Sequence, residues 1–390
     1  MTQFIVRKII LVLMIAVIYS CNLEKENKST ASKTQTLFTL LDTKETGIDF
    51  LNKVKNQKNF NIFKYRNFYN GGGVAIGDIN NDGLADIYLT GNMVANKLYL
   101  NKGNLTFEDI SISAGIEGNK PWSTGVVMVD INQDGLLDIY VSNAGNLKGN
   151  NHDNDLYINN GDLTFTEKAA EFNLAKTGFS THASFFDYDK DGDLDAYILN
   201  NSNIPVSSLG YAEQRDKRAQ DWANVPEIFR GVGDMLLRND NGKFVDVSEQ
   251  AGIYGSLIGF GLGVMVTDMN GDLYPDIYVS NDFYERDYLY INNQDGTFKE
   301  DITNWTSHLS LSAMGVDIAD INNDGNADIF ITDMLPEADQ RVKSVMEFEG
   351  YNVFKLKQSK DFSQQYIQNT LQLNNGNSTF SEVAYFSGVA

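Results

Sequence analysis

The stretch DINNDGLADIY, from Asp78 to Tyr88, places Asp78, Asn80, Asp82 and Asp86 within nine residues, with a glycine at position 83. Apolar runs flank it on both sides. Like charges this close repel one another, and burying them without a partner costs free energy. The stretch therefore predicts that a positive charge lies among these side chains.

The same stretch recurs four more times along the chain. The later copies are DINQDGLLD at Asp130–Asp138, DYDKDGDLD at Asp187–Asp195, DMNGDLYPD at Asp268–Asp276 and DINNDGNAD at Asp320–Asp328. Their starts lie 52, 57, 81 and 52 residues apart. A spacing of this size indicates a repeat architecture.

The flanks of the loops repeat as well. Each loop follows an apolar run such as GVAIGD and precedes three further runs, such as DIYLTG, KLYLNKG and TFEDIS. These runs are rich in Val, Ile, Tyr and Phe and are separated by Gly, Asn and Asp, which predicts four short strands per unit. Repeated four-stranded antiparallel units are typical of β-propeller blades. A solenoid is the disfavoured alternative, because its units are usually shorter or helical.

We therefore expect an all-β propeller over residues 37–390, with the first strand of each blade nearest the ring axis. Two insertions, 201–233 and 335–369, are each expected to hold a helix, near 211–222 and 337–348. The five expected blades are 71–113, 123–171, 180–249, 260–303 and 312–386.

We expect the ring to be incomplete. The fourth-strand Phe precedes the next loop Asp by 22 to 24 residues, so Phe380 would be followed by a further loop beyond Ala390. The segment LFTLLDTKETGI, residues 37–48, is similar to a fourth strand with its following connection, without three preceding strands of its own. Pairing of Phe38 beside Phe380 in a closed five-bladed ring would contradict this expectation.

The loop pattern suits calcium. In D-x-[DN]-x-D-G-x-x-D, positions 1, 3 and 5 direct side-chain oxygens to one side, Gly at 6 permits the bend, position 7 offers a carbonyl and Asp at 9 closes the cage. Calcium takes six to eight oxygens of this kind. One such loop would suit an ordinary Asn/Asp turn, but five in register favour about five Ca²⁺ sites. The loop at 268–276 departs from the pattern, with Gly271 at position 4 and Leu273 at position 6. The predicted ligands are Asp78, Asn80, Asp82, Asp86, Asp130, Asn132, Asp134, Asp138, Asp187, Asp189, Asp191, Asp195, Asp268, Asn270, Asp272, Asp276, Asp320, Asn322, Asp324 and Asp328.

Composition excludes several other classes. The chain is 42% hydrophobic and 12% aromatic, which argues against disorder. Its net charge of −21 argues against nucleic acid as a partner, since phosphate binding needs clustered Lys and Arg. Three His and one Cys cannot form a Cys/His metal cluster or an internal disulfide.

The N-terminus has the form of a secretory signal over residues 1–21. Arg7 and Lys8 precede an apolar run of ten residues, Ile9–Ile18, which is too short to span a bilayer. The sequence IYSC resembles a bacterial lipobox, which implies cleavage before Cys21 and lipidation of its thiol. An ordinary signal peptide with an incidental Cys is the alternative. Residues 22–36 are polar and are expected to form a flexible tether.

The loops and their flanks resemble the FG-GAP/VCBS repeats of integrin α-subunit propellers. They are more similar to bacterial VCBS-repeat lipoproteins of the cartilage-acidic-protein or ASPIC/UnbV type. The resemblance covers about residues 37–390 and implies a calcium-stabilised propeller for extracellular binding or adhesion. With the lipobox, it implies a lipid anchor at the bacterial outer membrane or cell surface.

We expect a non-catalytic module that binds an extracellular protein or glycan, and not an enzyme. The alternatives are a lyase-like enzyme acting on polysaccharides, and a structural stalk for a further C-terminal domain. An enzyme needs a general base or nucleophile that stands out from the repeat. His182 is the one residue found that does so.

Ligand recognition is expected on the face opposite the acidic loops, where the insertions and the blade-to-blade connections lie. For each aromatic residue there, packing between blades is favoured over ligand contact. His182 stands where the other repeats have Gly73, Gly125, Gly263 and Gly315, and filling the central funnel is favoured over ligand contact. The candidate residues of this face are Trp122, Phe179, His182, Phe260, Tyr284 and Trp305.

Overall fold

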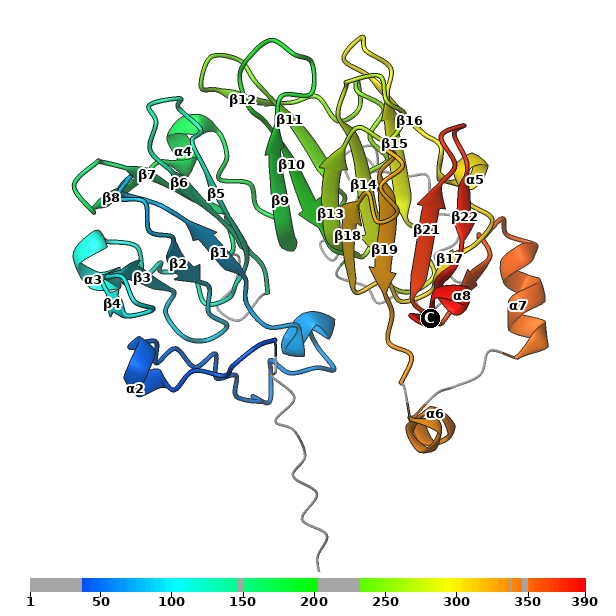
Figure 1. Cartoon of the computed structure of the whole chain (residues 1–390), viewed down its shortest axis with the longest axis horizontal. Coiled ribbons are helices and arrows are strands. Elements are labelled where there is room, and N and C mark those ends of the chain that lie inside the picture. The colour runs from blue at the N-terminus through cyan, green and yellow to red at the C-terminus, as the bar shows by residue number, and fades with distance from the viewer. Residues whose placement is uncertain (1–36, 146–150, 203–231, 337, 346–349) are drawn as a thin grey trace, which may run out of the picture. The chain divides into compact units, whose positions relative to one another are not determined.

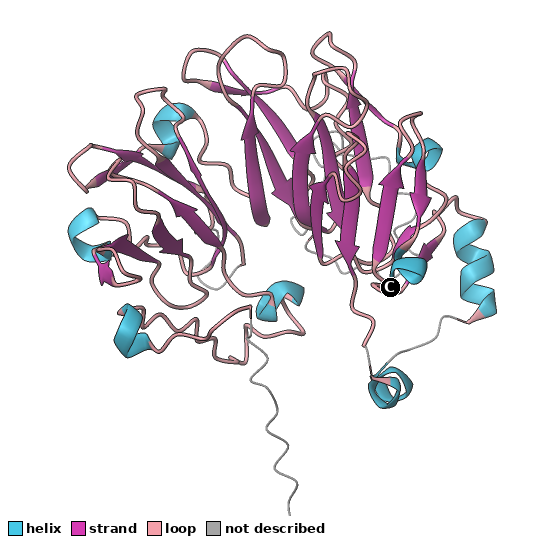
Figure 2. Cartoon of the chain, in the orientation of Figure 1, coloured by secondary structure: helices cyan, strands magenta, loops and turns pink. Residues whose placement is uncertain are grey.

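The computed structural model describes residues 37–145, 151–202, 232–336, 338–345 and 350–390. The chain divides into two compact units, Met1–Glu45 and Thr46–Ala390. The second unit contains five four-stranded antiparallel sheets, each with its strands in chain order (Figure 1). Figure 2 shows that strands dominate this unit and that its helices are short.

The five sheets are the blades of the propeller, here blades one to five. Blade one is β1 (Val74–Gly77), β2 (Asp86–Leu89), β3 (Lys97–Asn101) and β4 (Phe107–Asp109). Blade two is β5 (Ser123–Val129), β6 (Asp138–Asn143), β7 (Asp155–Asn159) and β8 (Phe165–Glu167). Blade three is β9 (Ser180–Phe186), β10 (Asp195–Asn200), β11 (Met235–Asn239) and β12 (Phe244–Asp246). Blade four is β13 (Gly261–Thr267), β14 (Asp276–Asn281), β15 (Tyr288–Asn292) and β16 (Phe298–Glu300). Blade five is β18 (Gly315–Ala319), β19 (Asp328–Thr332), β21 (Thr370–Asn374) and β22 (Phe380–Glu382).

The remaining elements are short connections and insertions. β17 (Leu309–Ser310) pairs in parallel with β20 (Gln365–Tyr366). The helices are α2 (Thr43–Thr46), η1 (Arg66–Tyr69), α3 (Ser111–Ala114), α4 (Ala169–Phe172), α5 (Ile302–Trp305), α6 (Asp339–Val345), α7 (Tyr351–Gln358) and α8 (Ala384–Ser387). No helix in the described part of the chain is both long enough and apolar enough to cross a membrane.

The hydrophobic core lies in layers between neighbouring blades. The first strands of consecutive blades pack together, β1 with β5, β5 with β9, β9 with β13 and β13 with β18. One layer joins Tyr88 and Leu98 of blade one to Val126 and Ile139 of blade two, and comparable layers join the later pairs. Successive strand residues point to opposite faces, so a strand covered on both sides is apolar throughout. The predicted all-β propeller and its five blades are thus confirmed.

The uncovered face of blade one agrees with the predicted incomplete ring. Val74 and Ile76 of β1 are 58% and 67% exposed, whereas the equivalent Val126 and Val264 are 4% and 5% exposed. Residues 37–48 were expected to resemble a fourth strand, but they contain α2 and no strand. Phe38 is accordingly 85% exposed, because it lacks the sheet that buries Phe380.

The second insertion holds two helices where one was predicted. α6 lies within the predicted range 337–348, and α7 follows it. The sequence pattern did not indicate α7, because Lys357 is its one buried residue and no apolar stripe marks its inner face. The helix predicted near 211–222 lies outside the described residues.

Candidate functional site

The acidic loops join the first and second strands of every blade. In blade one, Asp78 directly follows β1 and Asp86 begins β2. Because β1 and β2 are hydrogen-bonded neighbours, the hairpin brings the first and ninth loop positions to the same end of the sheet. The same placement holds in the other four blades.

The loop side chains point inward onto their own backbone. In blade one the Asp78 carboxylate accepts hydrogen bonds from the Asp82 and Gly83 N–H groups, at 3.2 and 2.7 Å. Asn80 Oδ1 also accepts from Asp82 N, and Asp82 Oδ1 accepts from Leu84 N. Blades two and five repeat this set of bonds. In these loops, backbone N–H groups of the same turn therefore satisfy most of the side-chain oxygens.

The aspartate at position 9 anchors each loop to its sheet. In blade two, Asp138 accepts hydrogen bonds from Ile131 N in the loop and from Asn159 N at the end of β7. It is fully buried, and burial raises its pKa to about 6. The equivalent Asp195 has its pKa raised by burial to about 7. These carboxylates are held where ionisation is costly unless a cation is close.

The loop at 268–276 keeps the common shape despite its unusual sequence. Positions 4 and 6 have positive φ in every loop, and here they are Gly271 (+78°) and Leu273 (+72°). Leu273 N still donates to Asp268 Oδ2, as Gly83 N does to Asp78. The departure therefore places a leucine in a left-handed conformation, which costs about 1–2 kcal/mol, and leaves the oxygens in place.

The loop of blade three differs in chemistry. In the other loops the position-3 Asn donates Nδ2 to the position-5 carboxylate, as Asn132 does to Asp134 at 2.9 Å. Asp189 has no such donor, and position 7 adds Asp193. The Oδ1 atoms of Asp189 and Asp193 are buried without a hydrogen-bond partner among the described residues.

This third loop fits a divalent cation best. Ligand oxygens of Asp187, Asp189 and Asp195 lie within 4.8 Å of one another. Burial, followed by the neighbouring Asp191, raises the pKa of Asp193 to about 6. Hard oxygen donors with unsatisfied lone pairs are what Ca²⁺ coordinates. Sequence analysis did not single out Asp193, although it is an extra acid within the same nine residues.

Most of the predicted ligand-face aromatics are core residues. Phe260 packs edge-on against Phe283 at 5.0 Å, and Trp305 lies 5.5 Å from Phe380, both as ring-centroid distances. Phe179 is buried in the same cluster as Trp122. The structure therefore places these three residues in packing contacts, which is the role that the sequence analysis favoured for them. Phe283 of the β14–β15 connection covers Phe260, and Phe380 of β22 covers Trp305.

Tyr284 is half-buried beneath the second insertion. Its ring contacts Phe362, and Lys357 Nζ lies 4.5 Å from the ring centroid. Trp122, in contrast, is fully buried, and it lines a cavity.

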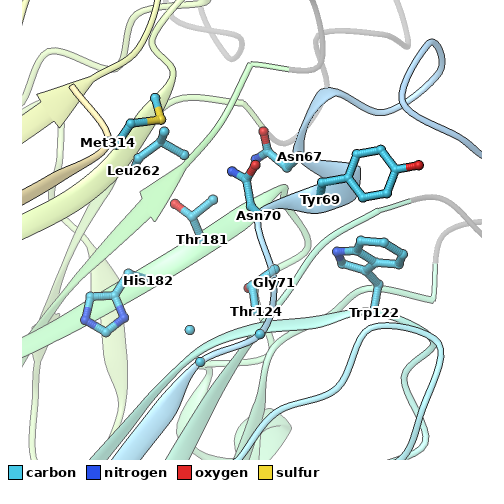
Figure 3. Close-up of a pocket in the computed structure, with 13 residues that line it drawn as sticks. Asn67, Tyr69, Asn70, Gly71, Trp122, Thr124, Thr181, His182, Leu262 and Met314 are labelled. Atoms are coloured by element: carbon cyan, nitrogen blue, oxygen red, sulfur yellow. The ribbon is translucent and has the colours of Figure 1, made fainter. Parts of the chain in front are cut away.

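That cavity lies where the first strands of all five blades begin (Figure 3). It has a volume of about 550 Å³, and we call it the inner pocket. Blades two to five contribute Thr124, Thr181 with His182, Leu262 and Met314. The structure places His182 in the lining of this pocket, and desolvation lowers the pKa of its imidazole.

Glycines beside the inner pocket permit the close approach of the first strands. A Cβ at Gly125 would lie 2.4 Å from the Thr181 carbonyl oxygen and 2.6 Å from His182 Nδ1. Glycine is therefore required next to the histidine.

One wall of the inner pocket was not predicted. Residues 67–73, which include Asn67, Tyr69 and Asn70, form it ahead of β1. Phe60, upstream of this wall, and Phe68, within it, pack against Trp122, with ring centroids 5.1 and 5.4 Å from that of the indole. The run NGGG before β1 was the available signal, since successive glycines mark a close backbone passage.

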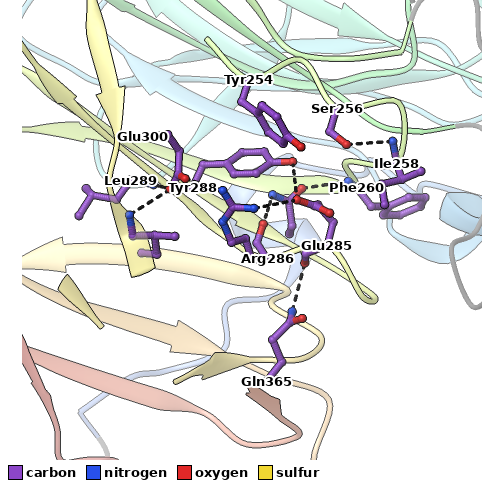
Figure 4. Close-up of polar contacts among 12 residues, drawn as sticks. Tyr254, Ser256, Ile258, Phe260, Glu285, Arg286, Tyr288, Leu289, Glu300 and Gln365 are labelled. Carbon is purple, nitrogen blue, oxygen red and sulfur yellow. Dashed lines mark hydrogen bonds and ion pairs between the residues drawn. The ribbon is translucent and has the colours of Figure 1, made fainter. Parts of the chain in front are cut away.

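A second polar cluster supports the connection between β14 and β15 (Figure 4). Arg286 lies between Glu300, at 2.5 Å, and Glu285, at 3.5 Å. Gln365 of the second insertion donates Nε2 to the Glu285 carbonyl at 3.1 Å. The cluster fastens the insertion to blade four, and it was not predicted.

Comparison with known proteins identifies the repeats. The FG-GAP-like repeat matches residues 78–141, 144–198 and 268–331. Cartilage acidic protein 1 of Xenopus tropicalis is 34% identical over 137 residues, which cover 34% of this chain and 20% of that protein. The mouse protein, Mus musculus, is 29% identical over 216 residues, covering 54% and 29%. The chain therefore spans less than a third of the curated relatives it matches.

Comparison with solved structures gives matches of low identity and with TM-scores below 0.5. A lectin of Agrocybe aegerita, described as recognising non-reducing terminal N-acetylglucosamine, has a TM-score of 0.44 and 17% identity, over 79% of this chain and 64% of that chain. The V. cholerae biofilm matrix protein Bap1 has a TM-score of 0.33 and 14% identity, over 67% and 35%. The repeat match and the five four-stranded sheets show that the chain carries FG-GAP-like repeats in an all-β fold.

Proposed function

We propose that this chain of FG-GAP-like repeats is a calcium-stabilised, cell-surface-anchored propeller that binds an extracellular protein or glycan without catalysis. The observation that carries the proposal is the loop of blade three, where buried carboxylate oxygens have no partner. A stable fold with that arrangement needs a cation. The other four loops keep Asp at positions 1, 5 and 9 and have Asn at position 3.

Calcium would be held by Asp187, Asp189, Asp191 and Asp195 in blade three and by the equivalent residues elsewhere. It would supply positive charge between the two inner strands of each blade. An ion that binds only the folded state stabilises it by mass action. Extracellular modules of this type often bind with a Kd of roughly 10⁻⁴–10⁻³ M.

A binding role is supported by the inner pocket at the opposite end of the strands. The pocket is built on rigid strands, the usual support for a recognition site. Its one titratable group able to act as a base near neutral pH is His182, and no carboxylate among its described lining residues orients the imidazole. This arrangement favours binding over acid–base catalysis.

Surface anchoring rests on the lipobox-like sequence ending at Cys21, which lies outside the described residues. Cys21→Ser should abolish metabolic labelling with palmitate and leave the protein in the aqueous phase of a detergent partition. Continued labelling of that variant would show that Cys21 is not the anchor.

The test of the whole proposal combines stability and binding. The thermal midpoint should rise with millimolar calcium and fall with EDTA, with magnesium as the control ion. The purified chain should be retained on immobilised glycans or matrix proteins in calcium and released by EDTA. An identical thermal midpoint in calcium and in EDTA would refute the proposal that calcium stabilises the fold. An ultraviolet-absorbing unsaturated product released from a polysaccharide would refute the non-catalytic role.

A further inference from the structure

The inner pocket is individual where the rest of the chain is repetitive. The residue preceding the glycine position is Gly72, Thr124, Thr181, Leu262 and Met314 in blades one to five. In contrast, every acidic loop keeps Asp at positions 1, 5 and 9. Structural repetition would tolerate the same residue in all five blades. One asymmetric ligand presents a different group to each strand. Different residues at the same position of the five strands are therefore expected where such a ligand binds.

The pocket lining carries no formal charge. None of its described residues is Lys, Arg, Asp or Glu, although the chain as a whole has a net charge of −21. Desolvation lowers the pKa of the half-buried His182, so its imidazole is neutral near neutral pH. A charged ligand would lose its hydration there without gaining a counter-charge. The lining therefore selects a neutral ligand.

Polar and apolar groups occupy different walls of the pocket. Leu262 and Met314 lie together on one side, and the amides of Asn67 and Asn70 face the cavity from another (Figure 3). Amide groups both donate and accept hydrogen bonds, as the hydroxyl groups of a polyol do. The apolar wall suits the C–H face of the same molecule.

Two aromatic residues complete the pocket. Tyr69 is 59% exposed at the rim and offers its ring as a platform. Trp122 is fully buried, and its Nε1–H has no acceptor among the described residues. Buried indole N–H groups usually find a partner. Nε1 is closed to solvent, so a ligand hydroxyl group reaches it only after a shift of the Trp122 side chain.

We infer that the inner pocket binds one neutral saccharide residue. The inference rests on the proposed function and narrows its ligand to glycans that present an uncharged sugar. A cavity of about 550 Å³ lies within the usual range for small-ligand sites. His182, with one nitrogen donating and the other accepting, would help to orient the sugar.

The test uses the purified full chain in calcium and a panel of methyl glycosides of glucose, galactose, mannose, fucose, N-acetylglucosamine and N-acetylgalactosamine. Glucuronate and glucosamine serve as charged comparators. Saturation-transfer NMR detects binding and calorimetry measures the Kd. At least one neutral glycoside should bind, and the matching charged sugar should bind about tenfold more weakly.

Three variants locate the site. Leu262→Trp fills the cavity, Tyr69→Ala removes the platform and His182→Gly restores the residue found in the other four blades. Each should weaken binding by about tenfold or more. Tyr385→Ala is the matched control, because this aromatic residue is 82% exposed and does not line the pocket. Unchanged thermal midpoints and an unchanged response to calcium show that each variant folds.

The possible results separate the inference from the function on which it rests. Loss of binding in the three pocket variants, with the control unaffected, supports the inference. Sugar binding that survives all three overturns the pocket but leaves a glycan-binding module elsewhere on the chain. If no neutral glycoside binds and a matrix protein does, the saccharide is refuted and the binding role stands. If neither binds, both are refuted.

Discussion

Blades two and three are neighbours with the same strand order, but they use different chemistry at both ends of their strands. Blade two has Asn132 in its acidic loop and Asn154 before its third strand; blade three has Asp189 and Asp234 at the same places. The amides satisfy their own hydrogen bonds. The carboxylates lack the amide donor: Asp189 keeps a buried oxygen without a hydrogen-bond partner among the described residues, and burial raises the pKa of Asp234.

The pair before the third strand shows this substitution most directly. Asn154 Oδ1 accepts from Asn143 N, and its Nδ2 donates to the Tyr140 hydroxyl at 2.9 Å. Asp234 accepts both from Asn200 N and from the Tyr197 hydroxyl, at 2.9 and 2.8 Å. Burial raises the pKa of Asp234 to about 7. The residue directly before the third strand is therefore ionisable in blade three, where it is Asp234, and not in blade two, where it is Asn154.

The largest expected effect comes from the loop anchors that the two blades share. Asp138→Ala and Asp195→Ala each leave two backbone N–H groups without their acceptor. Each should lower the free energy of unfolding by about 3 kcal/mol in saturating calcium. Thermal unfolding measures this, with Tyr385→Ala as the control, because Tyr385 is 82% exposed and lies outside the acidic loops. If only one of the two substitutions lowers the free energy of unfolding, the two aspartates do not have the same anchoring role.

The next effect depends on pH and distinguishes the two blades. The pKa of Asp234 is about 7 in the fold and about 3.8 when unfolded, so the unfolded chain loses this proton first and stability falls as pH rises between these values. Asp234→Asn should make that slope shallower by the contribution of one carboxyl group, while Asp287 at the equivalent place in blade four keeps its own. The variant should be more stable than wild type at pH 8, by about 2 kcal/mol, and similar at pH 4.

The groups facing Asp234 do not titrate in this range. They are the tyrosines Tyr197, Tyr288 and Tyr290, whose pKa values are raised far above neutral, chiefly by burial. Thermal midpoints from pH 4 to 8 measure the slope, and Asn154→Asp in blade two should introduce a similar one. Parallel curves for Asp234→Asn and wild type would contradict the assignment.

A smaller effect on stability, which depends on whether calcium is present, is expected in the acidic loop of blade three. Asp189→Asn gives blade three the amide donor of Asn132 and removes one negative charge. In EDTA the variant should be more stable than wild type by about 1–2 kcal/mol, because repulsion decreases. The rise in stability on adding calcium should be smaller for this variant than for the wild type. Asn132→Asp should do the reverse, and equal shifts in both media would rule out a metal in this loop.

The smallest effect tests loop shape without changing charge. Leu273 has a φ of +72° and is 77% exposed, so Leu273→Gly removes strain without uncovering the core. Stability should rise by about 1 kcal/mol in both calcium and EDTA. Leu136→Gly in the loop of blade two is the control, because Leu136 does not have positive φ. A gain seen only in calcium would show that the leucine affects the ion and not the turn.

Part of the site was predictable because its signals are local. Asp at positions 1, 5 and 9 with a positive-φ residue between them specifies a turn within nine residues, and the structure shows the same bonds in the loop with Leu273. The role of Asp234 was not predictable. Its partner Tyr197 lies 37 residues earlier, and the carboxylate is buried only when blades three and four pack together.

The amino-acid sequence by itself determined the repeat, the four strands of each blade and the places of the acidic loops, because strand alternation and turn geometry act over a few residues. Only the tertiary structure decided which aromatics are buried and which residues meet in the inner pocket. Phe60 covers Trp122, and Tyr69 shares a cavity with His182 and Met314, from segments far apart in the chain. Burial is a property of what packs on a residue, and here the covering residues come from other blades and from the segment before β1.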